Sequence, residues 1–82
     1  MEQDLLQILN AIDPALCSYE EWVEIGMALK HEGFTAADWD AWSARDGRRW
    51  HPGDCEKKWK SFQGAGAPVT AGTIVQIATS HG

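Results

Sequence analysis

The fold is decided by residues 17–45, which read CSYEEWVEIGMALKHEGFTAADWDAWSAR. Two helix starts lie in this stretch, because Ser18 is followed three residues later by Glu21, and Thr35 is followed three residues later by Asp38. The hydroxyl of such a cap accepts a hydrogen bond from a free N–H group of the first turn, and the acid bonds back to the cap. The stretch therefore predicts two consecutive helices.

The first of these helices is expected from Tyr19 to Glu32, with Gly33 as a left-handed residue just beyond its end. Residues spaced by three and four predict its inner face: Tyr19, Trp22, Ile25 or Gly26, and Leu29. The second helix is expected from Ala36 to Arg45, with Trp39 and Trp42 on adjacent turns. A glycine inside a helix costs about 0.8–1 kcal/mol relative to alanine. Gly26 therefore predicts that another helix passes close to its bare backbone.

The flanking sequence predicts three more helices, at Glu2–Ile12, Asp54–Phe62 and Ala71–Ser80. Thr70 and Thr73 repeat the capping pattern before the last of them. The segments 48–53 and 63–68 are rich in glycine or proline and are expected to be connectors. No stretch shows sustained alternation of apolar and polar residues, so we predict an all-α fold, a compact bundle of about five short helices forming a single domain over residues 1–82.

Composition narrows the class of protein. The chain has 82 residues, of which 44% are hydrophobic and 23% charged, as expected of a small globular domain. Its apolar runs are short, so we expect no membrane span and no secretory leader. Two cysteines cannot build a disulfide framework, so we expect a cytoplasmic protein with two buried thiols.

Five of the eight aromatic residues are tryptophans. Four of them lie on predicted inward faces and are interpreted as core: Trp22, Trp39, Trp42 and Trp59. The alternative is a set of platforms on which unpaired bases stack. Trp50 differs because it lies in a connector beside two arginines, but a ring folded over the core remains the preferred interpretation there too.

The charge distribution is uneven. Residues 1–44 carry a net charge of −8, residues 45–60 a net charge of +3, and the whole chain −5. An acidic total disfavours a strong general binder of nucleic acid, but it allows a local basic patch. Candidate nucleic-acid-binding residues are Arg45, Arg48, Arg49, Trp50, Lys57 and Lys60. A solvated face, or a site for an acidic partner protein, would explain the same cluster.

We predict no catalytic residues, no metal site and no cofactor. Asp38 and Asp40 are two residues apart on a helix and point in different directions, so they cannot share an ion. His51 and Cys55 have helical spacing, but two ligands fall short of a zinc site. The pair Ser80-His81 lies at an end that is expected to fray.

Four motifs together resemble a known family. They are YEEWVEIGMAL at 19–29, WDAWS at 39–43, CEKKWKSF at 55–62 and TAGTI at 70–74. In order and spacing they look like the primase C-terminal 2 domain, a small helical module found after the catalytic domain in phage and plasmid replication proteins. The resemblance is clearest over residues 13–82, and the acidic first helix lies outside its clearest part.

The resemblance implies a non-catalytic accessory domain of a longer DNA replication protein in a bacterial or phage-infected cell. Its implied partners are the primase catalytic domain, a helicase domain, or both, with single-stranded DNA as a further possible partner and no membrane. The family has no agreed active site to carry over. A pure protein-interaction or spacer module is the alternative, and a helix-turn-helix regulator is a third class, for which only Lys57 to Lys60 resemble a basic recognition helix.

Overall fold

The computed structural model describes residues 4–62 and 69–81. Within these residues the chain forms five α-helices, one 3-10 turn and no strand, which confirms the all-α prediction. The elements are α1 (Asp4–Asn10), η1 (Pro14–Leu16), α2 (Tyr19–His31), α3 (Ala36–Ser43), α4 (Asp54–Ser61) and α5 (Ala71–His81). Residues 2 and 3 of the predicted first helix and the predicted connector 63–68 lie outside the described residues. No described helix has the length and apolar character needed to cross a membrane.

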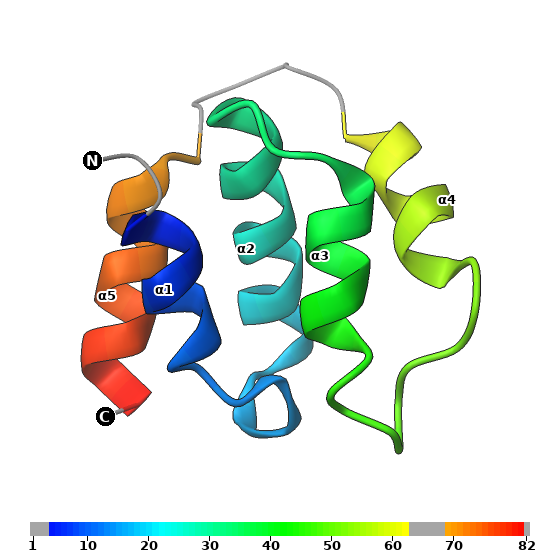
Figure 1. Ribbon diagram of the computed structural model, residues 1–82, viewed down its shortest axis with the longest axis horizontal. Coiled ribbons are helices and arrows are strands. Elements are labelled where there is room, and N and C mark those ends of the chain that lie inside the picture. The colour runs from blue at the N-terminus through cyan, green and yellow to red at the C-terminus, as the bar shows by residue number, and fades with distance from the viewer. Residues whose placement is uncertain (1–3, 63–68, 82) are drawn as a thin grey trace.

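Helix α2 occupies the centre of the bundle. Figure 1 shows α1 and α5 on one side of it and α3 and α4 on the other. Accordingly, α2 packs against α3, α4 and α5, while α1 packs on α5 and α4 packs on α3. With 13 residues, α2 is the longest of the described helices, and it contacts helices on both of its sides.

Two of the three predicted capping patterns, those at Ser18 and Thr35, are present as capping boxes. The Glu21 N–H donates to Ser18 Oγ at 3.1 Å, and the Ser18 N–H donates back to Glu21 Oε1 at 2.9 Å. Thr35 and Asp38 make the same reciprocal pair at the start of α3. Gly33 has a φ of 91°, the left-handed conformation that the sequence predicts just beyond α2.

The core is built around Trp39. Its side chain is fully buried, stacks on Trp22 with ring centroids 4.4 Å apart, and lies 5.4 Å from the Phe62 ring. Trp42 is also buried and donates its indole N–H to the Ile12 carbonyl at 3.0 Å. The close approach predicted at Gly26 is made by the rings of Trp39 and Phe62, which occupy the space of a missing side chain.

The core prediction holds only in part for the other tryptophans. Trp22 and Trp59 are only partly buried and pack against the core, while Trp50 packs over the core as its preferred interpretation expects. Tyr19 was predicted to face inward, and this is wrong, because its side chain is 59% exposed. Tyr19 is the first residue of α2, so its ring projects past the end of the core and lies beneath Lys58 Nζ, 5.7 Å away.

Several helix ends differ from the predicted ones. Helix α1 ends at Asn10 rather than Ile12, and α3 ends at Ser43 rather than Arg45. The turn η1 was not predicted. It forms because Asp13 accepts the Ala15 N–H at 3.0 Å and Pro14 supplies a fixed φ at the first position.

Candidate functional site

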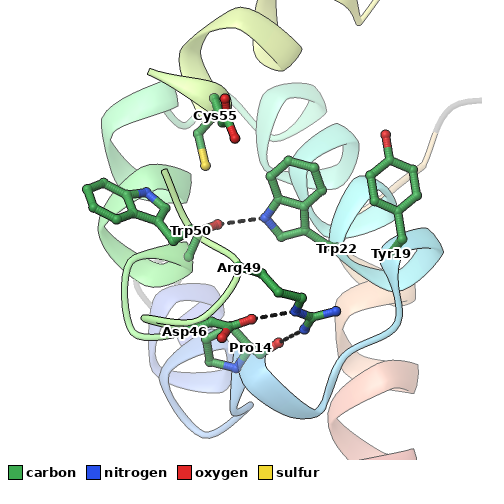
Figure 2. Close-up of a pocket in the computed structure, with 9 residues that line it drawn as sticks. Pro14, Tyr19, Trp22, Asp46, Arg49, Trp50 and Cys55 are labelled. Carbon is green, nitrogen blue, oxygen red and sulfur yellow. Dashed lines mark hydrogen bonds and ion pairs between the residues drawn. The ribbon is translucent and has the colours of Figure 1, made fainter. Parts of the chain in front are cut away.

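A pocket of about 170 Å³ opens where the connector between α3 and α4 passes the start of α2. Figure 2 shows Trp22 and Trp50 on opposite sides of it, with Arg49 and Asp46 at its base. The full lining is Pro14, Tyr19, Trp22, Ser43, Asp46, Arg49, Trp50, Asp54 and Cys55. The site thus combines aromatic walls with a guanidinium group and carboxylates.

The two indole rings of the pocket are held by hydrogen bonds. Trp22 Nε1 donates to Ser43 Oγ at 2.8 Å, and Trp50 Nε1 donates to Asp40 Oδ1 at 2.8 Å. Both N–H groups are therefore used within the protein, and the rings contribute apolar surface to the pocket. The ring of Trp50 folds back over the core, which agrees with the preferred sequence interpretation and leaves part of the ring as pocket wall.

Arg49 ties three segments together at the base of the pocket. Its Nε donates to Asp46 Oδ2 at 2.6 Å, and its Nη2 donates to the carbonyls of Pro14 and Cys17, each at 2.8 Å. Asp46 also accepts the Arg48 N–H at 3.2 Å. The bond from Arg49 is the largest cause that holds the pKa of the Asp46 carboxyl below its usual value of 3.8. The connector is thus fastened to η1 by one side chain.

The lowered pKa of Asp46 predicts an acid-sensitive fold. Because the folded-state pKa is below the unfolded value, this carboxylate stabilises the fold above about pH 4, and its contribution is lost as the pH falls through the folded-state pKa. We expect Asp46→Asn to lower the melting temperature near neutral pH and to flatten its fall between about pH 5 and 2. Thermal melts by circular dichroism over this range measure both effects.

Glu24→Gln is the matched control for this experiment. Glu24 is exposed, and its side chain makes no hydrogen bond to the described part of the chain. Its variant is expected to follow the wild-type pH profile. An Asp46→Asn protein with the wild-type melting temperature and the wild-type acid dependence would contradict the role given to the Asp46–Arg49 pair.

The pocket contains two groups that resemble nucleophiles. Burial raises the pKa of the Cys55 thiol to about 11, so the thiol stays protonated near neutral pH and is a poor nucleophile. Ser43 is buried, and its Oγ accepts the indole N–H of Trp22. None of the described lining residues is a histidine that could act as a base for it. The arrangement suits binding of a ligand better than acyl or phosphoryl transfer.

The structure separates the six candidate nucleic-acid-binding residues. Arg49 and Trp50 line the pocket, and Arg45 donates to the Asn10 carbonyl at 3.1 Å. The remaining three are exposed, and their side chains make no hydrogen bond within residues 4–62 and 69–81: Arg48, Lys57 and Lys60. Of the six, Trp50 lines the pocket, Arg49 both lines it and braces the fold, Arg45 braces the fold, and the other three face solvent.

Sequence reasoning missed several residues of the pocket. Tyr19 and Trp22 were assigned to the core, Cys55 was expected to be a buried thiol, and no role was given to Asp46. They come from α2, α4 and the connector, and no local spacing relates them. The one available signal was the run Arg48-Arg49-Trp50, in which cations flank an aromatic ring.

The chain is a small helical domain with a pocket lined by aromatic and charged side chains, and comparison with known families gives its class. The family model of Primase C terminal 2 (PriCT-2) matches residues 5–78. The chain belongs to this family, whose members are primase-associated domains. The match includes residues 5–10 of α1, which lay outside the clearest part of the sequence resemblance. A search of curated proteins and a search of solved structures each gave no match.

Proposed function

We propose that this chain is a non-catalytic accessory domain of a phage- or plasmid-type primase or primase-helicase, working in the cytoplasm of a bacterial or phage-infected cell. It orients the catalytic domains of the parent protein and contacts single-stranded nucleic acid. The family match supports the association with primase. The observation that carries the nucleic-acid part is the aromatic pocket with Arg49 at its base.

The pocket fits an unpaired base in chemical terms. Aromatic side chains bind bases of single strands by stacking, which contributes about 1–3 kcal/mol per base and tolerates any sequence. Tyr19 offers the most accessible ring, since it is 59% exposed and lies 5.7 Å from the Trp22 ring. A base that enters the pocket between Trp22 and Trp50 would also meet the guanidinium plane of Arg49.

The exposed cations supply the second part of the proposed contact. Arg48 follows the pocket residue Asp46 on the connector, and Lys57 and Lys60 belong to α4. Phosphate contacts of this kind give affinity that falls with salt, with a slope of about −0.7 per contact for single strands. Three cations on a chain of net charge −5 predict modest affinity that is measurable at low salt.

Fluorescence anisotropy with short labelled single-stranded DNA tests the cations. We expect the triple variant Arg48→Ala, Lys57→Ala and Lys60→Ala to weaken binding and to reduce the slope of log K against log salt by about 2. The matched control keeps each charge, with Arg48→Lys, Lys57→Arg and Lys60→Arg, and is expected to retain the wild-type slope. Binding unchanged in the alanine variant would remove these cations from the interface.

Tyr19 provides the matching test of the pocket. Tyr19→Ala is expected to weaken binding about fivefold or more, whereas Tyr19→Phe keeps the ring and is expected to bind like wild type. If neither DNA nor RNA binds at low salt while the primase catalytic domain forms a stable complex with this chain, the module is a protein-interaction or spacer domain instead.

A further inference from the structure

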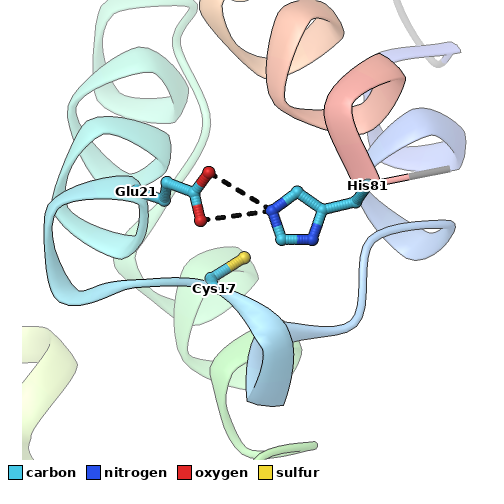
Figure 3. Close-up of side chains that lie close together, drawn as sticks. All are labelled: Cys17, Glu21 and His81. Atoms are coloured by element: carbon cyan, nitrogen blue, oxygen red, sulfur yellow. Dashed lines mark hydrogen bonds and ion pairs between the residues drawn. The ribbon is translucent and has the colours of Figure 1, made fainter.

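Three metal-ligating side chains meet where the end of α5 reaches the segment that leads into α2. One ligand atom from each of Cys17, Glu21 and His81 lies within 4.8 Å of the other two. His81 Nε2 lies 3.1 and 3.2 Å from the two carboxylate oxygens of Glu21. In Figure 3 the Cys17 sulfur points toward the gap between the carboxylate and the imidazole ring.

Two of the three groups are fixed before any ligand arrives. Cys17 ends η1, where its N–H donates to the Pro14 carbonyl and its own carbonyl accepts Arg49 Nη2 at 2.8 Å. Glu21 is held by the capping box, because its Oε1 accepts the Ser18 N–H at 2.9 Å. This bond is the largest cause that lowers the pKa of Glu21, so the group is a carboxylate near neutral pH.

The third group comes from the other end of the chain. His81 is the last residue of α5, and the packing of α5 on α2 brings its ring to Glu21 across 60 positions of sequence. The site is also accessible, since the side chains of His81 and Glu21 are 16% and 29% exposed, while Cys17 is buried beneath them. An ion can therefore enter from the solvent side and reach the sulfur.

We propose that Cys17, Glu21 and His81 form a binding site for a divalent cation of the zinc class. Thiolate, carboxylate and imidazole are the ligands that zinc prefers, at lengths of about 2.0–2.3 Å, which places the atoms of a tetrahedral set roughly 3.3–3.7 Å apart. The observed separations of up to 4.8 Å need only small side-chain rotations to reach that spacing. Three protein ligands leave the fourth position to water.

Binding replaces a proton on the Cys17 thiol, and that proton passes to solvent. Burial, followed by the nearby Glu21 carboxylate, raises the pKa of this thiol to about 11, so the free protein carries the thiol form. The ion would fasten α5 to the segment that joins η1 to α2. Pro14 of η1 and Tyr19 of α2 flank that segment and line the pocket, so an occupied site would stiffen one pocket wall.

Titration of the 82-residue chain with Co²⁺ tests the site, because a cobalt–thiolate bond gives a charge-transfer band in the near ultraviolet. We expect one equivalent to bind, Zn²⁺ to displace it, and Zn²⁺ to raise the melting temperature by several degrees. Cys17→Ser is expected to abolish the band. His81→Ala and Glu21→Gln are expected to weaken Co²⁺ binding at least tenfold.

Cys55→Ala and His51→Ala are the matched controls, since they remove the other cysteine–histidine pair and are expected to leave the band and the affinity unchanged. His81→Ala keeps the test valid if Cys17→Ser fails to fold, because His81 is the last residue of a helix whose remaining contacts stay in place. A wild-type chain without the band, or a band that survives in Cys17→Ser or is lost in Cys55→Ala, would overturn the proposal.

Discussion

Trp39→Ala is expected to destabilise the fold by about 3–5 kcal/mol, the usual cost of removing a buried tryptophan side chain. A domain of this length has a total stability of about 4–12 kcal/mol. Trp39 has no exposed surface, and its ring contacts Trp22, Trp59 and Phe62, so the cavity left behind would lie between α2, α3 and α4. Urea denaturation followed by far-ultraviolet circular dichroism measures the loss.

Trp39→Phe is the matched variant. It keeps an aromatic ring at the centre of the core and deletes an indole N–H that has no hydrogen-bond partner among the described residues. The deletion costs no hydrogen bond, so we expect a markedly smaller loss than for alanine. A Trp39→Ala protein with the wild-type denaturation midpoint would show that the core is organised around other residues.

Gly26→Ala is expected to destabilise the fold by about 1–3 kcal/mol, although alanine is the better helix former. A Cβ at this position would lie 2.6 Å from Cε2 and Cζ2 of Trp39 and 2.9 Å from Cε2 of Phe62. Both rings are buried and cannot move aside without disturbing their own neighbours. The overpacking therefore outweighs the gain in helix propensity. Chemical denaturation compared with wild type measures the net effect.

Gly72→Ala is the control, because it makes the same change in another helix. A Cβ there would meet only Thr70 Oγ1, at an ordinary contact distance of 3.5 Å. Its variant is expected to be neutral or slightly more stable, by at most about 1 kcal/mol. If both alanine variants gain stability alike, the contacts of Trp39 and Phe62 with Gly26 do not exclude a side chain at that position.

The features predicted correctly from the sequence are local ones. The Ser18–Glu21 and Thr35–Asp38 caps depend on residues three apart, so their spacing alone identifies them. The left-handed conformation of Gly33 follows in the same way from its position after a helix. The tight packing at Gly26 could be inferred because a glycine inside a helix costs stability unless space requires it.

Features set by the meeting of distant segments could not be predicted. Arg49 was assigned to a basic patch, but its guanidinium group bonds to Asp46 and to carbonyls more than 30 positions away. Tyr19 has the helical spacing of a core residue, yet it lies at the first turn, where the core has ended. Periodicity identifies the face of a helix and not how far along that face the neighbouring helices reach.

His81 illustrates the same limit at the end of the chain. It was expected to lie at a frayed end, and this is wrong, because it belongs to α5 and pairs with Glu21. The cluster with Cys17 has no signature in the sequence, since its members are four and 60 positions apart and belong to three different elements. Only the packing of α5 on α2 reveals it.

The carboxyl end of helix α4 depends on Lys30 of α2 for hydrogen bonds. Its ammonium group donates to the carbonyls of Trp59 and Phe62, at 3.0 and 3.1 Å, and so satisfies acceptors at the end of an eight-residue helix. Helices this short are not stable alone in water. Helix α4 and its two exposed lysines, Lys57 and Lys60, therefore exist as an ordered surface only while the helix stays packed against α2 and α3.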